Sequence, residues 1–119
     1  MKILIVDDSK VMRKMIQKGL RQAGYECEVV EAGDGVEALE KLDASITVVF
    51  VDVKMPVMDG IELVKEIRKR GNAVPILMIT TESSQERIDE AKNAGANGYL
   101  IKPFTPAKIK KHLGEVVEN

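Results

Sequence analysis

The sequence predicts an α/β fold built around a doubly wound, five-stranded parallel sheet. Short apolar runs, none longer than six residues, alternate with longer segments that carry helical periodicity. Most of the runs are rich in Val, Ile or Leu, and the middle ones lack a strict apolar–polar alternation, which is typical of parallel strands covered on both faces. Right-handed crossovers would then distribute the helices over both faces of the sheet. The five strands are expected at residues 3–6, 27–30, 46–51, 76–79 and 99–101.

Helices are expected between these runs, because apolar residues there recur at steps of three and four. Ser9 is expected to cap the first helix and Gly24 to close it. The other helices are expected at about residues 35–42, 60–71, 84–94 and 106–117. The apolar positions of the first helix are Val11, Met12, Met15, Ile16, Leu20 and Ala23.

Composition limits the possible functions. A chain of 119 residues fits one compact domain, so we expect a single domain over 1–119 with no output domain. The 18 basic and 19 acidic side chains leave a net charge of -1, which gives no basic field for DNA or for a membrane surface. Cys27 is the single cysteine and cannot form an internal disulfide, so a reducing, cytoplasmic setting is expected. The apolar start is too short for a signal peptide or a membrane-inserted span.

Polar side chains follow the predicted strands at the points where they end. Asp7 and Asp8 follow the first strand, Asp52 the third, Thr80 the fourth and Lys102 the fifth. Carboxyl ends of parallel strands share one edge of a sheet, where ligands of such folds bind. Three crowded carboxylates repel one another unless a cation intervenes, and carboxylates with open positions suit Mg²⁺. A lysine and a hydroxyl at the same edge can donate to phosphate oxygens.

Four segments carry a specific resemblance. "ILIVDDS", "VFVDVKMPVMDGIEL", "ILMITTES" and "ANGYLIKPF" are similar to the signatures of bacterial two-component response-regulator receiver domains, in order and along the whole chain. They look most like the stand-alone, CheY-like chemotaxis type. The resemblance implies a flavodoxin-like (βα)5 fold with strand order 2-1-3-4-5. It also implies a signalling protein rather than an enzyme, and we expect it to be a monomer.

The resemblance assigns roles at the strand ends. Asp52 would be the phosphoacceptor, taking a phosphoryl group from a histidine kinase or a phosphotransfer protein. Asp7, Asp8, Asp52 and the backbone carbonyl of Lys54 would hold Mg²⁺, with Mn²⁺ as a possible substitute. Lys102 would bind the phosphoryl oxygens, and its bond to the following proline would be cis.

Further positions would transmit the signal. Thr80 would hydrogen-bond the phosphoryl group and Tyr99 would turn inward behind it. A downstream protein would then bind the face formed by the fourth helix, the fifth strand and the fifth helix, with Ile88 and Lys92 among the contacts. On the first helix, Lys14 and Lys18 belong to a basic stripe expected to dock the kinase or phosphotransfer partner.

Lys54 and Glu82 stand two residues after the phosphoacceptor and the switch threonine. In the family these positions flank the path of the hydrolysing water, so the two side chains are expected to tune the lifetime of the phosphoryl group. Familiar enterobacterial chemotaxis receivers have asparagine at the Lys54 position, whereas a lysine is similar to a sporulation-type phosphorelay intermediate. The sequence therefore leaves both a chemotaxis output and transfer to a histidine phosphotransfer protein open.

Two other classes compete with a phosphoreceiver. A flavodoxin-like cofactor-binding protein would need a loop rich in Ser, Thr and Gly after the first strand, where this chain has Asp7 and Asp8. An aspartyl-phosphate hydrolase would need an acid–base aspartate at the position that Lys54 occupies. Both classes are therefore less favoured than the receiver.

Overall fold

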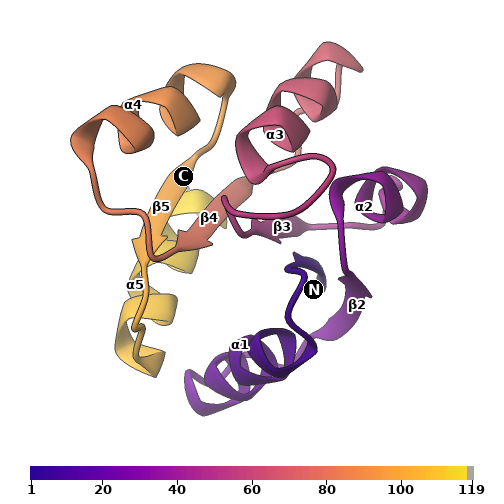
Figure 1. Cartoon of the computed structure of the whole chain (residues 1–119). Coiled ribbons are helices and arrows are strands. Elements are labelled where there is room, and N and C mark those ends of the chain that lie inside the picture. Colours follow the sequence, from indigo (N-terminus) through magenta and orange to yellow (C-terminus); the bar gives the residue numbers. More distant parts are fainter. Residues whose placement is uncertain (118–119) are drawn as a thin grey trace.

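The computed structural model describes residues 1–117 and confirms the predicted α/β fold. Within these residues the strands form one parallel sheet in the order β2-β1-β3-β4-β5 (Figure 1). The strands are β1 (Lys2–Val6), β2 (Glu28–Ala32), β3 (Val48–Val51), β4 (Ile76–Thr80) and β5 (Gly98–Ile101). The helices are α1 (Lys10–Gln22), α2 (Gly35–Lys41), α3 (Gly60–Lys69), α4 (Gln85–Ala94) and α5 (Pro106–Val117).

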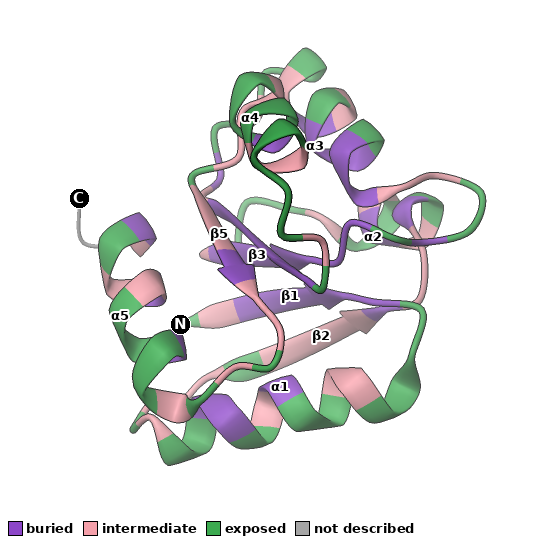
Figure 2. Ribbon diagram, turned by 60° about the vertical axis from the view of Figure 1, so that its left-hand side comes forward, coloured by how far each residue is buried: buried purple, intermediate pink, exposed green. Residues whose placement is uncertain are grey.

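The helices cover both faces of the sheet. Helices α1 and α5 lie on one face, and α2, α3 and α4 lie on the other (Figure 1). Each face has its own apolar core, one centred on Phe50 with α1 and α5, the other on Val49 and Val51 with α2, α3 and α4. Strands β1, β3 and β4 are almost wholly buried between these layers (Figure 2). This two-sided burial explains why their sequences are apolar without alternation.

The ends of α1 are closed as expected. The Ser9 hydroxyl accepts a hydrogen bond from the Met12 N–H at 3.1 Å, which satisfies one of the free donors of the first turn. At the other end Gly24 has a φ of 92°, and the Tyr25 N–H donates to the Leu20 carbonyl at 3.0 Å. Glycine reaches this left-handed conformation without a steric penalty, so it ends the helix cleanly.

Only some of the apolar positions of α1 are buried. Val11 and Met15 are 70% and 51% exposed, whereas Ile16 and Leu20 are buried against the sheet and α5. Steps of three and four define two neighbouring stripes on a helix, and only the stripe that contains Ile16 and Leu20 points inward. Val36 on α2 is likewise exposed.

Strand boundaries shift by one to two residues. β2 begins at Glu28 and extends to Ala32, and β3 begins at Val48 rather than at residue 46.

In the described residues no helix is long and apolar enough to cross a bilayer.

Candidate metal and phosphoryl site

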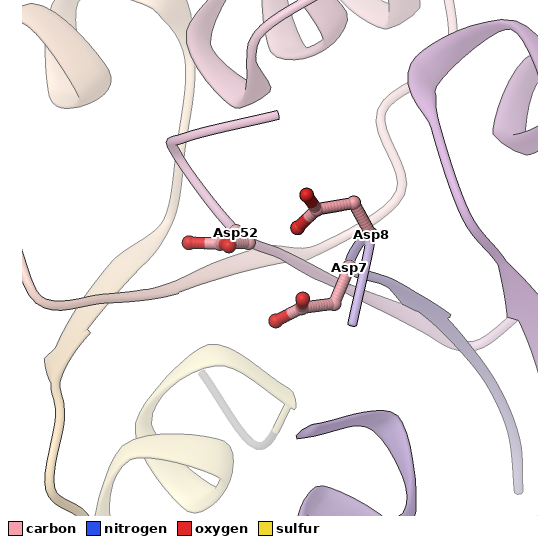
Figure 3. Close-up of side chains that lie close together, drawn as sticks. All are labelled: Asp7, Asp8 and Asp52. Carbon is pink, nitrogen blue, oxygen red and sulfur yellow. The ribbon is translucent and has the colours of Figure 1, made fainter. Parts of the chain in front are cut away.

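The carboxylates predicted to meet at one sheet edge do so. Val6 and Val51 are register partners on adjacent strands, so the residues that follow them lie side by side. The Asp52 N–H donates to the Val6 carbonyl at 3.0 Å, which continues the ladder past the last strand residue. One carboxylate oxygen from each of Asp7, Asp8 and Asp52 lies within 4.8 Å of the others, and the side chains project to the same side (Figure 3).

Exposure differs within this cluster. Asp7 is 2% exposed and Asp52 8%, whereas Asp8 is exposed at the rim. The Asp7 carboxylate also accepts a hydrogen bond from the Ser9 N–H at 2.9 Å. The cluster therefore has a fixed, buried side and an open side that faces solvent.

The ammonium group of the Lys102 side chain lies on the buried side of the carboxylate cluster. Its Nζ lies 3.3 Å from Asp7 Oδ2 and 3.8 Å from Asp52 Oδ1. The Lys102 N–H donates to the Thr80 carbonyl at 2.7 Å, and the Lys102–Pro103 peptide bond is cis, as the resemblance implied. One ammonium group does not neutralise three carboxylates, so the cluster keeps an excess of negative charge.

This environment disfavours ionisation of the Asp52 carboxyl. Burial raises the pKa of Asp52 to about 6, Lys102 opposes the shift, and the charges of Asp7 and Asp8 add to it. The donor set is all oxygen, partly open to solvent and over-rich in negative charge, which fits a divalent cation such as those of receiver domains.

Gly60 lets helix α3 begin directly behind Asp52. A Cβ at Gly60 would lie 2.1 Å from the Asp52 carbonyl oxygen, far inside van der Waals contact. The Gly60 N–H donates to the Val53 carbonyl at 2.8 Å, and the Asp59 side chain caps the helix. The Asp59-Gly60 pair therefore allows the start of α3 to lie directly against the backbone of Asp52 and Val53.

Thr80, Glu82 and Tyr99 form a connected group beside the cluster. The buried Thr80 hydroxyl oxygen accepts from the Glu82 N–H at 3.1 Å. The half-buried Tyr99 hydroxyl donates to the Glu82 carbonyl at 2.9 Å. Burial, and secondly the Glu82 charge, raises the pKa of Tyr99, so this hydroxyl stays protonated and available as a donor. Residue 82 is thus held from both sides of its backbone by the two side chains predicted to act as the switch.

Lys54 and Glu82 form an ion pair beside the carboxylate cluster. Lys54 Nζ lies 3.3 Å from Glu82 Oε1, with the Lys54 side chain 69% exposed. A hollow beside the pair is lined by Asp8, Lys54 and Glu82, and also by Arg87 of α4. Arg87 was not singled out from the sequence, because nothing distinguishes it there from the other polar residues of this segment.

The four predicted docking residues lie apart from the carboxylates, on two helices. Lys14 and Lys18 are exposed on α1, where they border a shallow apolar hollow formed by Val11 and Met15. Ile88 is half-buried and Lys92 is exposed on α4.

Sequence reasoning missed the part that Arg13 takes in this edge. Its Nη1 donates to the Asp7 carbonyl at 2.6 Å and its Nε to Glu31 Oε1 at 3.0 Å. The available signal was the segment Asp7-Asp8-Ser9 followed by Met12-Arg13, because one turn of helix brings residue 13 back over the strand end.

A parallel sheet with this acidic, lysine-containing edge defines a class of protein that can bind a divalent cation together with a phosphoryl group. Comparisons with known proteins identify the family. Residues 3–114 match the family described as response regulator receiver domain. The chain is 49% identical to chemotaxis protein CheY1 of Helicobacter pylori, covering 98% of this chain and 96% of that protein. It is 42% identical to a CheY homologue of Campylobacter jejuni, covering 98% and 92%.

Solved structures agree with this assignment. Chemotaxis protein CheY4 of Vibrio cholerae superimposes with a TM-score of 0.86 at 47% sequence identity, over 97% of each chain. A CheY-like receiver domain protein of Methanospirillum hungatei superimposes with a TM-score of 0.85 at 30% identity, over 98% of this chain and 93% of that one. The chain belongs to the response regulator receiver domain family.

Membership has three direct consequences. The protein is a CheY-like receiver signalling protein, not a classical enzyme, and the cofactor-binding and hydrolase alternatives are disfavoured. The family implies a histidine kinase as partner. The acidic cluster is consistent with the divalent metal site typical of receiver domains.

Proposed function

We propose that this protein is a phosphorylation-dependent switch that accepts a phosphoryl group on Asp52 from a histidine kinase. The carrying observation is the arrangement of Asp52, buried at a strand end, within 4.8 Å of two further carboxylates and 3.8 Å from the Lys102 ammonium. Within the described residues no other cluster of three acidic, histidine or cysteine ligands occurs.

The proposed reaction is an in-line phosphoryl transfer. A carboxylate oxygen of Asp52 attacks the phosphorus, the new P–O bond forms, and the P–N bond to the donor histidine breaks. The electron pair stays on the imidazole nitrogen. Lys102 is close enough to Asp52 to pair with the oxygens of the transferred group and to favour the negative charge they carry.

Asp7, Asp8, Asp52 and the Lys54 carbonyl would hold Mg²⁺, or Mn²⁺ in its place. The bound cation supplies positive charge that offsets the carboxylates and the phosphoryl oxygens. The remaining work belongs to the chain: rigid strand ends fix the carboxylates, and burial excludes water from the inner side of Asp52.

Thr80 and Tyr99 would carry the signal outward. The phosphoryl group would give the Thr80 O–H an acceptor, and movement of the hydroxyl towards it would draw the Thr80 oxygen away from the Glu82 N–H that now donates to it. Movement of Thr80 would release the Glu82 backbone, and Tyr99 would rearrange because its hydroxyl is bound to the same residue. The β4–α4 segment would then adopt a second arrangement that a partner can recognise.

The proposed output is binding of a chemotaxis or motor protein to the face formed by α4, β5 and α5, with Ile88 and Lys92 among the contacts. Its support is that the most similar relatives described above are named chemotaxis proteins. A phosphorelay intermediate that passes the group to a histidine phosphotransfer protein is the second candidate, because Lys54 is similar to that type. In either case Lys14 and Lys18 of α1 would dock the phosphodonor protein, and the protein would act as a cytoplasmic monomer.

The test detects a phosphoryl group attached covalently to the protein. Wild-type protein and Asp52→Asn are incubated with Mg²⁺ and a small acyl phosphate, and intact masses are compared. Wild type gains the mass of one phosphoryl group, while Asp52→Asn and a sample with excess chelator do not. No gain in the wild type would refute the proposal.

A further inference from the structure

The Arg13 side chain bridges the metal-ligand turn and strand β2. We propose that Arg13, held in place by Glu31, is a positioning residue that fixes the Asp7–Asp8 turn and thereby sets the affinity of the cation site. This inference rests on the proposed function of that site. It assigns Arg13 no contact with the reacting atoms.

The contacts of Arg13 are short and directional. Its Nη1 donates to the Asp7 carbonyl at 2.6 Å, while its Nε donates to Glu31 Oε1 at 3.0 Å. Only 16% of its side chain is exposed, so water competes weakly for these donors. A planar guanidinium presents its donors in fixed directions from several nitrogens, so it can orient two separate acceptors, whereas an ammonium group offers rotatable donors from one nitrogen.

The Asp7 carbonyl belongs to the peptide unit that joins Asp7 to Asp8. Fixing this oxygen therefore fixes the peptide plane between two of the three acidic side chains. The Asp7 carboxylate is restrained separately by the Ser9 N–H and by Lys102. Asp8 is exposed, so the direction of its carboxylate depends chiefly on its own backbone, which Arg13 holds from one side.

Glu31 is well suited to hold Arg13. It lies on β2 as the register partner of Ile5, and the Lys41 Nζ donates to its backbone carbonyl at 2.6 Å. Its carboxylate also pairs with Lys14 at 3.0 Å. Hydrogen bonds from Lys14 first, and then from Arg13, lower the pKa of Glu31, so it remains ionised and gives Arg13 a charge-assisted acceptor.

Two possible roles of Arg13, as a nearby positive charge or as a positioning residue, predict opposite effects of its removal on Mg²⁺ affinity. As a mere positive charge, Arg13 would repel Mg²⁺, and its removal would tighten metal binding. As a positioning residue, it keeps the carboxylates aligned, and its removal weakens binding. Residues that orient metal ligands typically change metal affinity by at least about tenfold when removed.

The experiment is calorimetric titration of the metal-free protein with Mg²⁺ at fixed ionic strength. Arg13→Gln should raise the Kd for Mg²⁺ about tenfold. Arg70→Gln is the matched control, because it removes an arginine with the same charge at the far end of α3, where Arg70 pairs with Glu66. Its Kd should equal that of the wild type. Circular dichroism and urea unfolding verify that each variant is folded.

Arg13→Lys keeps the positive charge but replaces the planar guanidinium with a single ammonium group. It should give a Kd between those of wild type and Arg13→Gln, and it remains informative if Arg13→Gln fails to fold. The link to Glu31 is tested by Glu31→Gln, alone and combined with Arg13→Gln. If Glu31 acts through Arg13, its substitution has little further effect on Kd in the Arg13→Gln background.

The outcomes separate the two proposals. An unchanged or lower Kd in Arg13→Gln, in a wild type that does bind Mg²⁺, overturns the positioning role and leaves the site intact. An equal effect of Glu31→Gln in both backgrounds overturns the link through Arg13. Failure of the wild type to bind Mg²⁺, or unchanged binding in Asp8→Asn, contradicts the cation site itself.

Discussion

The Asp52 carboxyl group has unusual chemistry because of where β3 ends. It is 8% exposed, and burial raises its pKa to about 6, with Asp7 and Asp8 adding to the shift and Lys102 opposing it. At neutral pH the group is therefore ionised but costly to keep so. Positive charge at this edge of the sheet would lower the free-energy cost of keeping Asp52 ionised. A bound cation is therefore favoured at the end of β3.

The raised pKa makes stability depend on pH with a defined sign. Because Asp52 ionises less readily in the folded than in the unfolded chain, it destabilises the fold increasingly as the pH rises from the ordinary aspartate pKa of about 4 to about 6, and the effect levels off above that. In metal-free protein, Asp52→Asn should be more stable than wild type by roughly 1–3 kcal/mol above pH 7, and the difference should shrink towards pH 4. Urea unfolding at both pH values measures it. A difference that is the same at both would contradict the pKa shift.

The exposed Lys54 and the half-buried Glu82 form an ion pair next to the proposed phosphoacceptor. If the pair shields the aspartyl phosphate from water, Lys54→Ala and Glu82→Ala should each speed its loss. The change should be at most about fivefold, because exposed pairs are worth at most about 1 kcal/mol. Decay of the phosphorylated mass after removal of donor measures the rate. Glu66→Ala, which breaks the exposed pair with Arg70, is the control, and unchanged rates in both test variants would exclude the shielding role.

Among the helices, α4 is the one least anchored in the core. Ala91 is its one buried residue, and the helix is exposed over most of its surface (Figure 2). A helix with so little buried apolar area can shift at low cost in free energy. Its N-terminal end follows Glu82, which Thr80 and Tyr99 hold, so a change at Thr80 reaches α4 through a short segment.

Thr80→Ala should therefore separate phosphorylation from its consequence. The variant should still accept a phosphoryl group from an acyl phosphate, because Lys102 and the carboxylates are unchanged. The change in amide hydrogen exchange that phosphorylation causes over α4 and β5 in wild type should be lost. Its neighbour Thr81 is exposed, so Thr81→Ala is the matched control. A wild-type exchange response in Thr80→Ala, or unchanged binding of an identified partner, would contradict the switch.

The elements also show how far the sequence predicts the structure. Residues that follow parallel strands lie at the same edge of the sheet. The order of the apolar runs was therefore enough to predict that Asp7, Asp52 and Lys102 lie close together. Helix faces are less certain, because Val11 and Ile16 obey the same spacing and only packing against α5 decides which is buried. Contacts between elements, such as Arg13 with Glu31, depend on side-chain reach and cannot be deduced from periodicity.

On the scale of the whole molecule, the phosphorylation edge and the proposed docking helix are distinct but adjacent. Helix α1 starts directly after Asp7 and Asp8, and its exposed basic residues surround an apolar hollow. A partner bound there would have its phosphorylated histidine near the sheet edge. With a net charge of only -1, the molecule has no global field to steer a partner, so local charge on α1 gains importance.

Lys14→Glu combined with Lys18→Glu should slow phosphoryl transfer from a histidine kinase about tenfold at low salt, since reversed charge lowers the association rate. Transfer from a small acyl phosphate should be unaffected at saturating Mg²⁺, which offsets any loss of cation affinity caused by breaking the Lys14–Glu31 pair. The control is Lys65→Glu with Lys69→Glu, two exposed lysines of the same spacing on α3. Stopped reactions with each donor measure the two rates. Equal slowing with both donors would argue against docking through α1.

The central claim is that Asp52 carries the phosphoryl group, and site mapping tests it most directly. Protein treated with Mg²⁺ and an acyl phosphate is reduced with borohydride, which converts an aspartyl phosphate into homoserine, and is then digested and analysed by tandem mass spectrometry. We predict homoserine at position 52, and none when Mg²⁺ is chelated. Homoserine at another aspartate, with residue 52 unmodified, would contradict the account.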